Sequence, residues 1–397
     1  MSFDDTPYDF DTQIDRRGTN STKWDELQNF AGVSPDTGLA MWVADMDFRA
    51  PEFLQDATRQ VLDTANYGYF TGMKSFNDSV AWWMKTRHNW QIDTDWIFVT
   101  CSLGNGIALA LHCFTKPGDH VITFNPVYHE FQIKIEKTGR VATQLPLAVV
   151  DGLFEMDFDA YDAMLTGKEK MVIISSPHNP AGRIWTKAEL TALADFCQRH
   201  DLLLISDEIH NDLVMPGHTH IPMHVAAPQI EDRLIMMTSA SKTFNIAGLR
   251  TGCVIIPDAR LRAKFARYFD SMEIKPNLFG IALTRAAYSP AGAAWVDALI
   301  AYIDENQRVF NAAINEIPGV SAMPMQGTYL AWVDFADTGM PMSEVRERIY
   351  GQAQIGATWG PTLGPGGETC VRLNLGTNRA RVLDAAQRIK EAFCDLQ

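Results

Sequence analysis

An alternation of strand-like and helix-like segments between about residues 52 and 290 constrains the fold more than any other feature. Short apolar runs recur in this region, among them HVITF, MVIISS, LLLISD and GCVIIP, and amphipathic stretches separate them. In TKAELTALADFCQRH, for example, the apolar side chains recur at helical spacing. Strands that alternate with helices usually pair in parallel and need helices over both sheet faces. The sequence therefore predicts an α/β fold with a mostly parallel sheet between helices.

The chain after residue 290 has a different pattern. A helical pattern without an internal proline covers 291–317, and two strand-like pieces, TYLAWVDF and CVRLNLG, and a last helix follow it. We interpret this part as a smaller α+β domain that the N-terminal segment joins. The predicted division is a large domain at 49–289 and a discontinuous small domain at 1–48 and 290–397. A length of 397 residues suits about two domains.

Charge and cysteine content exclude several function classes. Lys and Arg total 34 against 48 Asp and Glu, and the resulting net charge of −14 opposes binding to nucleic acid or anionic membranes. The six cysteines include no C-x-x-C pair, so we expect no disulfide framework. The start, MSFDDTPYDF, lacks the features of a signal peptide, and no apolar run approaches membrane-spanning length. We therefore expect a cytoplasmic protein without nucleic-acid or membrane partners.

Polar residues follow several predicted strands, and ligands of open α/β sheets bind beyond the carboxyl ends of strands. Lys242, in SASKTFNIAGLR, lies between small and apolar residues. Burial would lower the pKa of such a lysine, as a nucleophilic amine requires. Ser239, Ser241 and Arg250 suit a phosphate, although no Gly-x-x-x-x-Gly precedes the lysine, which excludes a nucleotide P-loop. Taken alone, this stretch favours a lysine that merely ends a strand.

Asp207 ends the strand LLLISD at the edge of the core, where a charge needs a partner. A protonated pyridine nitrogen is one suitable partner. A metal ion is the alternative, because His210, His218, His220 and His224 follow in sequence. Their spacing matches no common metal motif, and the loop GHTHIPMH favours solvated side chains for the last three. We therefore expect no metal site.

Three further features are weak when taken alone. The turn Gly104-Asn105-Gly106 opens a predicted helix, where free N–H groups and the helix dipole favour a phosphate, but such turns also occur without a ligand. Tyr128, in FNPVYHEF, is compatible with simple packing. Arg372, in CVRLNLG, lies on the opposite strand face from its apolar neighbours, so it either faces solvent or points into a cleft.

Lys242, Asp207, Asn179 and the glycine turn occur in the order and spacing of a known family. Over nearly its whole length the chain resembles the fold-type I pyridoxal-phosphate (PLP) enzymes, the class I/II aminotransferase superfamily. It resembles most strongly the branch of cystathionine β-lyases and related C–S lyases. The strings behind this resemblance are TKWDE at 22–26, MWVADMDFRAPE at 41–52, SSPHNPAGR at 175–183, SDEIHNDL at 206–213, SKTFNIAGL at 241–249 and VRLN at 371–374.

The resemblance implies roles for the catalytic and substrate-binding residues. Lys242 is similar to the lysine that holds PLP and accepts the Cα proton, and Asp207 to the carboxylate that keeps the pyridine nitrogen protonated. Tyr128 resembles the ring stacked on the cofactor, and we count it with these two as catalytic. Asn179 resembles the amide that hydrogen-bonds the ring O3′ and also lies beside the substrate. Arg372 resembles the arginine that binds the substrate α-carboxylate.

The resemblance also implies a phosphate cup and a partner subunit. The residues similar to the cup are Gly104, Asn105, Gly106, Ser239, Ser241 and Arg250. His210 stands where aminotransferases have a tyrosine that also contacts O3′, as in the lyase branch. Tyr69, in YGYF, resembles a tyrosine that reaches the phosphate from a second subunit, which implies a homodimer with shared active sites.

Three details complete the expectations. Lyase relatives often have glutamine at the position of Arg250, and many relatives have an aromatic residue at the position of Leu363; both differences concern the substrate range. In similar folds the bonds Asn125–Pro126 and Asn179–Pro180 are often cis, and we expect both to be cis.

The resemblance leaves the reaction open between two classes. In both, the amino acid displaces Lys242, which then removes the Cα proton. A β-lyase next expels a thiolate from Cβ and yields pyruvate and ammonia, whereas an aminotransferase releases a keto acid. The motifs favour a lyase for cystathionine or other S-substituted L-cysteines, with an L-amino-acid aminotransferase as the alternative. A regulator that keeps the fold and binds protein or DNA is a third reading, which the charge and the lack of a helix-turn-helix pattern disfavour.

Overall fold

The computed structural model describes residues 8–396. Residues 1–7 and 397, which the sequence assigns to the small domain, lie outside this range. Within that range a seven-stranded sheet has the order β2-β10-β9-β8-β7-β3-β4. Neighbouring strands are parallel except at β10, which is antiparallel to β2 and β9. The strands are β2 (Ile97–Thr100), β3 (His120–Asn125), β4 (Val141–Pro146), β7 (Glu169–Ser175), β8 (Leu203–Asp207), β9 (Leu234–Thr238) and β10 (Gly252–Ile255). The predicted mostly parallel sheet is confirmed.

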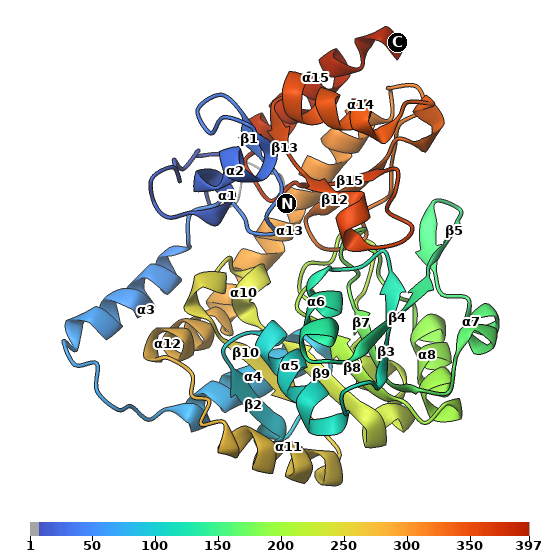
Figure 1. Ribbon diagram of the computed structural model, residues 1–397. Helices are drawn as coiled ribbons and strands as arrows, with labels where there is room; N and C mark the ends of the chain where they lie inside the picture. The colour runs from blue at the N-terminus through green and yellow to red at the C-terminus, as the bar shows by residue number, and fades with distance from the viewer. Residues whose placement is uncertain (1–7, 397) are drawn as a thin grey trace.

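Helices cover both faces of this sheet (Figure 1). Alternate residues of one strand enter different apolar clusters; Val172 joins one and Ile173 the other. This two-sided burial explains why the strands read as continuous apolar runs. One face packs against α5 (Leu103–Phe114), α6 (Glu130–Lys137) and α11 (Ala259–Ser271). The other packs against α3 (Glu52–Asp63), α4 (Met73–His88), α8 (Lys187–Arg199), α12 (Leu278–Ala287) and the first part of α13 (Pro290–Ile314).

A third apolar cluster joins the N-terminal segment to the C-terminal part. It contains a four-stranded antiparallel sheet of β11 (Ser321–Ala322), β12 (Leu330–Asp334), β15 (Cys370–Asn374) and β14 (Thr358–Trp359), with α15 (Arg379–Ala392). The N-terminal strand β1 (Leu39–Ala40) pairs in parallel with β13 (Ile355–Gly356). Helix α13 confirms the predicted long helix; its first part packs on the large sheet and its last part enters the third cluster. The domain boundaries themselves remain a proposal, which this third cluster supports.

Shorter elements complete the described chain. They are α1 (Thr22–Asp25), α2 (Leu27–Ala31), the hairpin of β5 (Ala148–Val150) and β6 (Leu153–Glu155), α7 (Phe158–Met164), α9 (Met223–Ala226), α10 (Ala240–Thr243), α14 (Met342–Arg346), the π-helix η6 (Glu347–Gln352) and the 3-10 helices η2 (Thr94–Trp96), η3 (Pro228–Arg233), η4 (Ala247–Leu249), η5 (Ala336–Thr338), η7 (Gly360–Leu363) and η8 (Cys394–Leu396). None of the helices in residues 8–396 is long and apolar enough to cross a membrane. The six cysteines are all free.

The structure corrects one expectation about the histidine loop. His220, predicted to be solvated, is only 7% exposed, and its Nε2 lies 2.9 Å from Oε2 of Glu208. Glu208 is fully buried, and a buried carboxylate needs such a partner. His218 is exposed, as predicted, and His224 is half-buried. Among the described residues, no group of His, Cys, Asp and Glu side chains could hold a metal ion.

Residues 42–47, within MWVADMDF, form a segment that we call the N-terminal strap. The string TKWDE, at 22–26, contacts this strap. Lys23 is fully buried, and its Nζ lies 2.9 Å from Oδ2 of Asp47, whose Oδ1 accepts a hydrogen bond from Trp24 Nε1 at 3.0 Å. Burial alone would raise the pKa of Asp47, but the charge of Lys23 and these hydrogen bonds hold it below its usual value. Asn374 Nδ2 donates to the backbone oxygens of Val43 and Asp45. The motif therefore fixes the strap.

We expect Asp47→Asn to lower the free energy of unfolding by about 3–5 kcal/mol, because Lys23 would lose its nearest buried counter-charge. The pKa of Asp47 is lowered on folding, so its contribution is present at neutral pH and is lost as the pH falls through the folded pKa. The difference between variant and parent should therefore shrink in acid. Urea unfolding at neutral and acidic pH measures both effects.

The matched control is Asp36→Asn, which removes an exposed ion pair with Arg17. Because solvent screens this pair, its loss should change the free energy of unfolding far less than Asp47→Asn does. An Asp47→Asn variant as stable as this control would show that the buried pair does not fix the strap.

Candidate active site

A cavity of about 970 Å³ lies at the carboxyl ends of the central strands, and the N-terminal strap forms part of its wall. Most of the residues predicted from sequence line it. They are Gly104, Asn105, Tyr128, Asn179, Asp207, His210, Ser239, Ser241, Lys242, Arg250 and Arg372. The structure does not bring Gly106 or Tyr69 to this cavity. Residues as distant in sequence as Gly104 and Arg372 thus meet in one site.

Lys242 lies in α10, a short helix that directly follows β9. Its Nζ donates a hydrogen bond of 2.6 Å to the backbone oxygen of Ala44 in the strap. Burial lowers the pKa of Lys242 to about 8, against the opposing charge of Asp45. A lysine with such a pKa has an appreciable unprotonated fraction near neutral pH, as a nucleophile or base requires.

Asp207 is the last residue of β8 and is 6% exposed. Burial raises its pKa to about 7, and the N–H of Ile209 donates to its Oδ1 at 3.2 Å. It forms no ion pair within residues 8–396, so a cationic ligand group would stabilise its charged form. His210 is also buried; its Nδ1 has no hydrogen-bond partner, and burial lowers its pKa to about 3. The imidazole is therefore neutral.

Arg372 comes from β15 and is only 4% exposed. One terminal nitrogen donates to Asn179 Oδ1 at 2.9 Å, and the other to the Trp42 oxygen at 2.8 Å and Thr358 Oγ1 at 2.9 Å. Its Nε has no hydrogen-bond partner within the described residues. Burial lowers the pKa of Arg372 to about 10, so it stays charged at neutral pH. No carboxylate in the described chain forms an ion pair with it, which favours an anionic ligand.

Tyr128 lies beside this arginine and remains a phenol. Its N–H donates to the backbone oxygen of Asn179 at 3.1 Å, which ties the two loops together. Burial, with the nearby charge of Glu130, raises the pKa of Tyr128 to about 12. The side chain is therefore a ring for packing or a hydrogen-bond donor at neutral pH, and a poor base.

The opposite part of the cavity suits an anion. Ser102 caps α5 by accepting the Asn105 N–H at 3.2 Å, so this helix begins at the cavity wall. Ser239 and Ser241 bring two hydroxyls 2.7 Å apart, and Arg250 is exposed there. Helix N-termini, hydroxyls and guanidinium groups all bind phosphate oxygens.

Gly106 does not line the cavity and instead allows α5 to pack closely on the sheet. Its N–H donates to the Ser102 oxygen at 3.0 Å, and a Cβ at this position would lie 2.8 Å from Val254 Cγ2. Glycine therefore lets the helix pack closely on the sheet. Lys134 of α6, which sequence reasoning missed, lines the cavity beside Gly104 and pairs with Glu130. From sequence alone, a lysine on an amphipathic helix that lines a cavity cannot be distinguished from one that faces solvent.

The turn that presents Asn179 differs from the prediction at one bond. Asn125–Pro126 is cis, as predicted, but the second cis bond is Ser176–Pro177, so the prediction for Asn179–Pro180 is wrong. Both prolines belong to one turn, and the small energy difference between the isomers of X–Pro bonds gives the sequence no means of choosing between them. The N–H of Asn179 instead donates to Ser175 Oγ at 3.2 Å.

The residues present fit PLP group by group. The start of α5 and its neighbouring hydroxyls suit the phosphate, and the Lys242 amine suits the aldehyde carbon. Asp207, a buried carboxylate without an ion-pair partner in the described chain, suits a pyridinium nitrogen. The buried, unpartnered Oδ1 of Asn105 and Nδ1 of His210 leave further hydrogen-bonding capacity in the cavity wall.

Comparisons with known proteins agree with this assignment. The model of the family "Aminotransferase class I and II" matches residues 48–389. Cystathionine beta-lyase PatB of Bacillus subtilis is 37% identical, over 97% of this chain and 99% of its own. Protein MalY of Escherichia coli is 30% identical, over 94% and 96%.

Solved structures give the same answer. Cystalysin from Treponema denticola, which contains a PLP cofactor, has a TM-score of 0.93 at 34% identity, with 99% of this chain and 100% of that chain covered. The PLP-bound C-S lyase from Staphylococcus hominis has a TM-score of 0.88 at 28% identity, with 98% and 99% covered. The chain therefore belongs to the class I and II aminotransferase family, in its PLP-dependent branch of cystathionine β-lyases and C–S lyases.

Proposed function

We propose that this chain is a PLP-dependent C–S β-lyase that cleaves cystathionine or other S-substituted L-cysteines to a thiol, pyruvate and ammonia. The observation that supports it best is the presence in one cavity of Lys242, a lysine of lowered pKa, and Arg372, a buried guanidinium without a carboxylate partner among residues 8–396. Together they suit the Cα proton and the α-carboxylate of an amino acid. Relatives named cystathionine beta-lyase and C-S lyase support sulfur as the leaving atom.

Each residue has a defined task in this proposal. PLP, when bound, supplies an electron sink for the negative charge that develops at the substrate Cα. Asp207 stabilises a proton on the pyridine nitrogen through its buried charge, and Asn179 and His210 hydrogen-bond the ring. Tyr128 packs on the ring, and Lys242 takes the Cα proton before the C–S bond breaks.

The phosphate end has its own set of residues. The N–H groups at the start of α5, with Ser239 and Ser241, bind the phosphate oxygens, and Arg250 adds a positive charge. The two serine hydroxyls also reach the backbone oxygen of Thr251, at 2.7 and 3.4 Å, which fixes their position. These residues would hold the phosphate of PLP at the end of the cavity beside α5.

Arg372 is already oriented before substrate arrives. Asn179, Trp42 and Thr358 accept hydrogen bonds from its two terminal nitrogens and fix the plane of the guanidinium. A rigid fork of this kind matches a planar carboxylate and costs little ordering entropy on binding. We propose that the substrate carboxylate displaces some of these neutral acceptors.

A competition assay separates the lyase from an aminotransferase. The purified holoenzyme is given S-methyl-L-cysteine, cystathionine or L-phenylalanine, each with 2-oxoglutarate as amino acceptor. We expect pyruvate from the two sulfur substrates, because a thiolate is a competent leaving group at Cβ, and at most a trace of glutamate from any of them. Glutamate formation that exceeds pyruvate formation would favour the aminotransferase.

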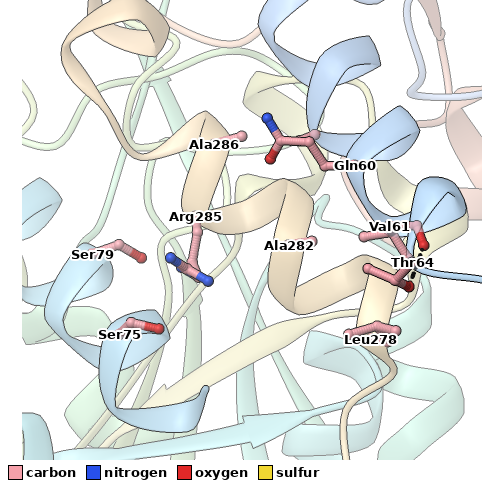
Figure 2. A pocket seen from close by; sticks show the side chains of 10 residues that line it. Gln60, Val61, Thr64, Ser75, Ser79, Leu278, Ala282, Arg285 and Ala286 are labelled. Carbon is pink, nitrogen blue, oxygen red and sulfur yellow. Dashed lines mark hydrogen bonds between the residues drawn. The ribbon is translucent and has the colours of Figure 1, made fainter. Parts of the chain in front are cut away.

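We also propose a homodimer with shared active sites. The segment between α3 and α4, with the first residue of α4, exposes four large apolar side chains, Tyr67, Tyr69, Phe70 and Met73, which soluble monomers rarely gather on one segment. Beside it, α3, α4 and α12 form a groove whose lining mixes apolar side chains such as Val61 and Leu278 with polar ones and Arg285 (Figure 2). Tyr69 is fully exposed, so in this proposal it serves the partner's cavity.

Subunit mixing tests the shared site. When inactive Tyr69→Ala and Lys242→Ala subunits exchange freely, half of the dimers are mixed, and each mixed dimer has one intact site of two; we expect about a quarter of parental activity. The matched control mixes Arg372→Ala with Lys242→Ala, which come from one subunit's site and should not complement. Equal activity in the two mixtures would contradict the shared site.

We further propose a cytoplasmic location and no nucleic-acid partner. The net charge of −14 opposes binding to phosphate backbones, and the free cysteines suit a reducing compartment. Cell fractionation and an assay of binding to DNA at low salt test these two statements.

A further inference from the structure

A buried carboxylate lies next to the candidate site but outside its cavity wall. Asp212 is 3% exposed and accepts three side-chain hydrogen bonds. Its Oδ2 accepts from Thr243 Oγ1 at 3.0 Å, and its Oδ1 accepts from Trp83 Nε1 and lies the same distance, 2.9 Å, from His88 Nε2. The four residues come from the loop after β8, from α10 and from α4. None of the four lines the cavity of the candidate site.

The charge of Asp212 is stabilised by its surroundings. Burial alone would raise its pKa, but the hydrogen bond and charge of His88, the charge of Arg87 and the Thr243 hydroxyl hold the pKa below its usual value. A side chain that must satisfy three donors at once has little freedom to move. Asp212 is therefore an immobile carboxylate in contact with Thr243 of α10, and we call it the anchor.

The element that Asp212 holds is the one that presents the lysine. Lys242 and Thr243 are neighbours in α10, a helix of four residues, Ala240–Thr243. So short a helix is not stable by itself, so tertiary contacts must fix its orientation. Thr243 is fully buried, and its hydroxyl bond to Asp212 is one such contact. Movement of Thr243 would move the backbone from which the Lys242 amine extends.

A second imidazole–carboxylate pair lies beside the first. The rings of His88 and His220 are 5.9 Å apart and nearly perpendicular, and His220 pairs with Glu208. Glu208 directly follows Asp207 and also accepts from Ser206 Oγ at 2.8 Å. A separate hollow of about 300 Å³ is lined by His88, Asp212 and His220. A buried imidazole–carboxylate pair thus lies next to the backbone of both Lys242 and Asp207 and restricts its movement.

We propose that Asp212, held by His88 and Trp83, is a positioning residue for Lys242 and acts on it through Thr243. This inference rests on the proposed role of Lys242 as the residue that takes the Cα proton. Proton transfer requires the amine within hydrogen-bond reach of that proton, and a displacement of about 1 Å can reduce turnover by about a hundredfold. The anchor keeps the amine at that distance.

Thr243→Val tests the proposal in the holoenzyme. Valine has nearly the shape of threonine but cannot donate to Asp212, which keeps its two other donors. We expect kcat to fall about tenfold with KM changed by less than about twofold, because substrate binding through Arg372 is untouched. The visible circular dichroism of the bound cofactor, which reports its orientation, should fall by about half. Thr243→Ser keeps the hydroxyl and should restore both values.

Control variants separate positioning from a loss of stability. Glu231→Gln disrupts an exposed pair with His224 and should leave kcat and the circular dichroism unchanged. If Thr243→Val does not fold, Asp212→Asn keeps the shape of the anchor without its charge and should lower kcat and the dichroism in the same direction. A lowered melting temperature with unchanged kcat and unchanged dichroism would overturn the proposal. The dichroism needs no substrate, so it remains informative even if the protein cleaves no S-substituted cysteine.

Discussion

Lys242→Ala should reduce turnover by about four orders of magnitude or more, because the variant loses both the amine that holds the cofactor and the base that removes the Cα proton. Neither Tyr128 nor Tyr329, whose hydroxyl donates to the same Ala44 oxygen as Lys242 at 3.0 Å, can replace this base, since burial raises the pKa of Tyr128 to about 12 and that of Tyr329 well above its usual value. The parent protein should be yellow and should lose its visible band on treatment with borohydride. Mass spectrometry of the reduced parent should then place one pyridoxyl group on Lys242.

The control for this experiment is Lys187→Ala, which removes an exposed lysine of α8. It should keep the colour, the covalent pyridoxyl group and full activity. A pyridoxyl group on any lysine other than Lys242, or turnover that survives in Lys242→Ala, would refute the assignment.

Arg372→Ala should lower kcat/KM by about two to three orders of magnitude. Charge-assisted hydrogen bonds contribute about 1.5–3 kcal/mol each, and the variant loses a two-pronged grip on the α-carboxylate. It also leaves Asn179 Oδ1 and Thr358 Oγ1 without their buried donor. Arg372→Lys should recover only part of the loss, because an ammonium group lacks the planar fork. Steady-state kinetics on one S-substituted cysteine measures both variants.

The cofactor spectrum separates a substrate role from a cofactor role for this arginine. We expect both variants to bind PLP with a parental spectrum, since the phosphate end of the cavity is built from other residues. Loss of PLP from Arg372→Ala, or near-parental activity, would show that Arg372 does not bind the substrate carboxylate.

The local elements and the strand-end residues could be predicted from the sequence because both follow from neighbouring residues. Apolar runs and helical spacing gave β7, β8, α8 and α13 to within a few residues. The carboxyl ends of parallel strands meet at one edge, so Asp207 and Lys242 were expected together. Arg372 left two readings open, and only its packing against the strap placed it in the cavity.

Features that depend on distant partners could not be predicted from residue patterns alone. Nothing in TKWDE shows that its lysine pairs with Asp47 in the strap. The polar loop around His220 predicts a solvated side chain. In the structure this side chain is buried and pairs with Glu208, which lies twelve residues earlier. The anchor at Asp212 is of the same kind, since its donors come from separate helices. The motifs shared with the family identify the residues of the site. The contacts in the structure show what those motifs do, as the pairing of Lys23 with Asp47 illustrates.

The most direct test of the account is the product balance from a single substrate. Purified holoenzyme is incubated with S-methyl-L-cysteine in the absence of any keto acid, and methanethiol, pyruvate and ammonia are measured in the same sample, with Lys242→Ala in parallel. The account predicts equal amounts of the three products over many turnovers and none from the variant. A keto acid that retains the sulfur, or no pyruvate at all, would contradict it.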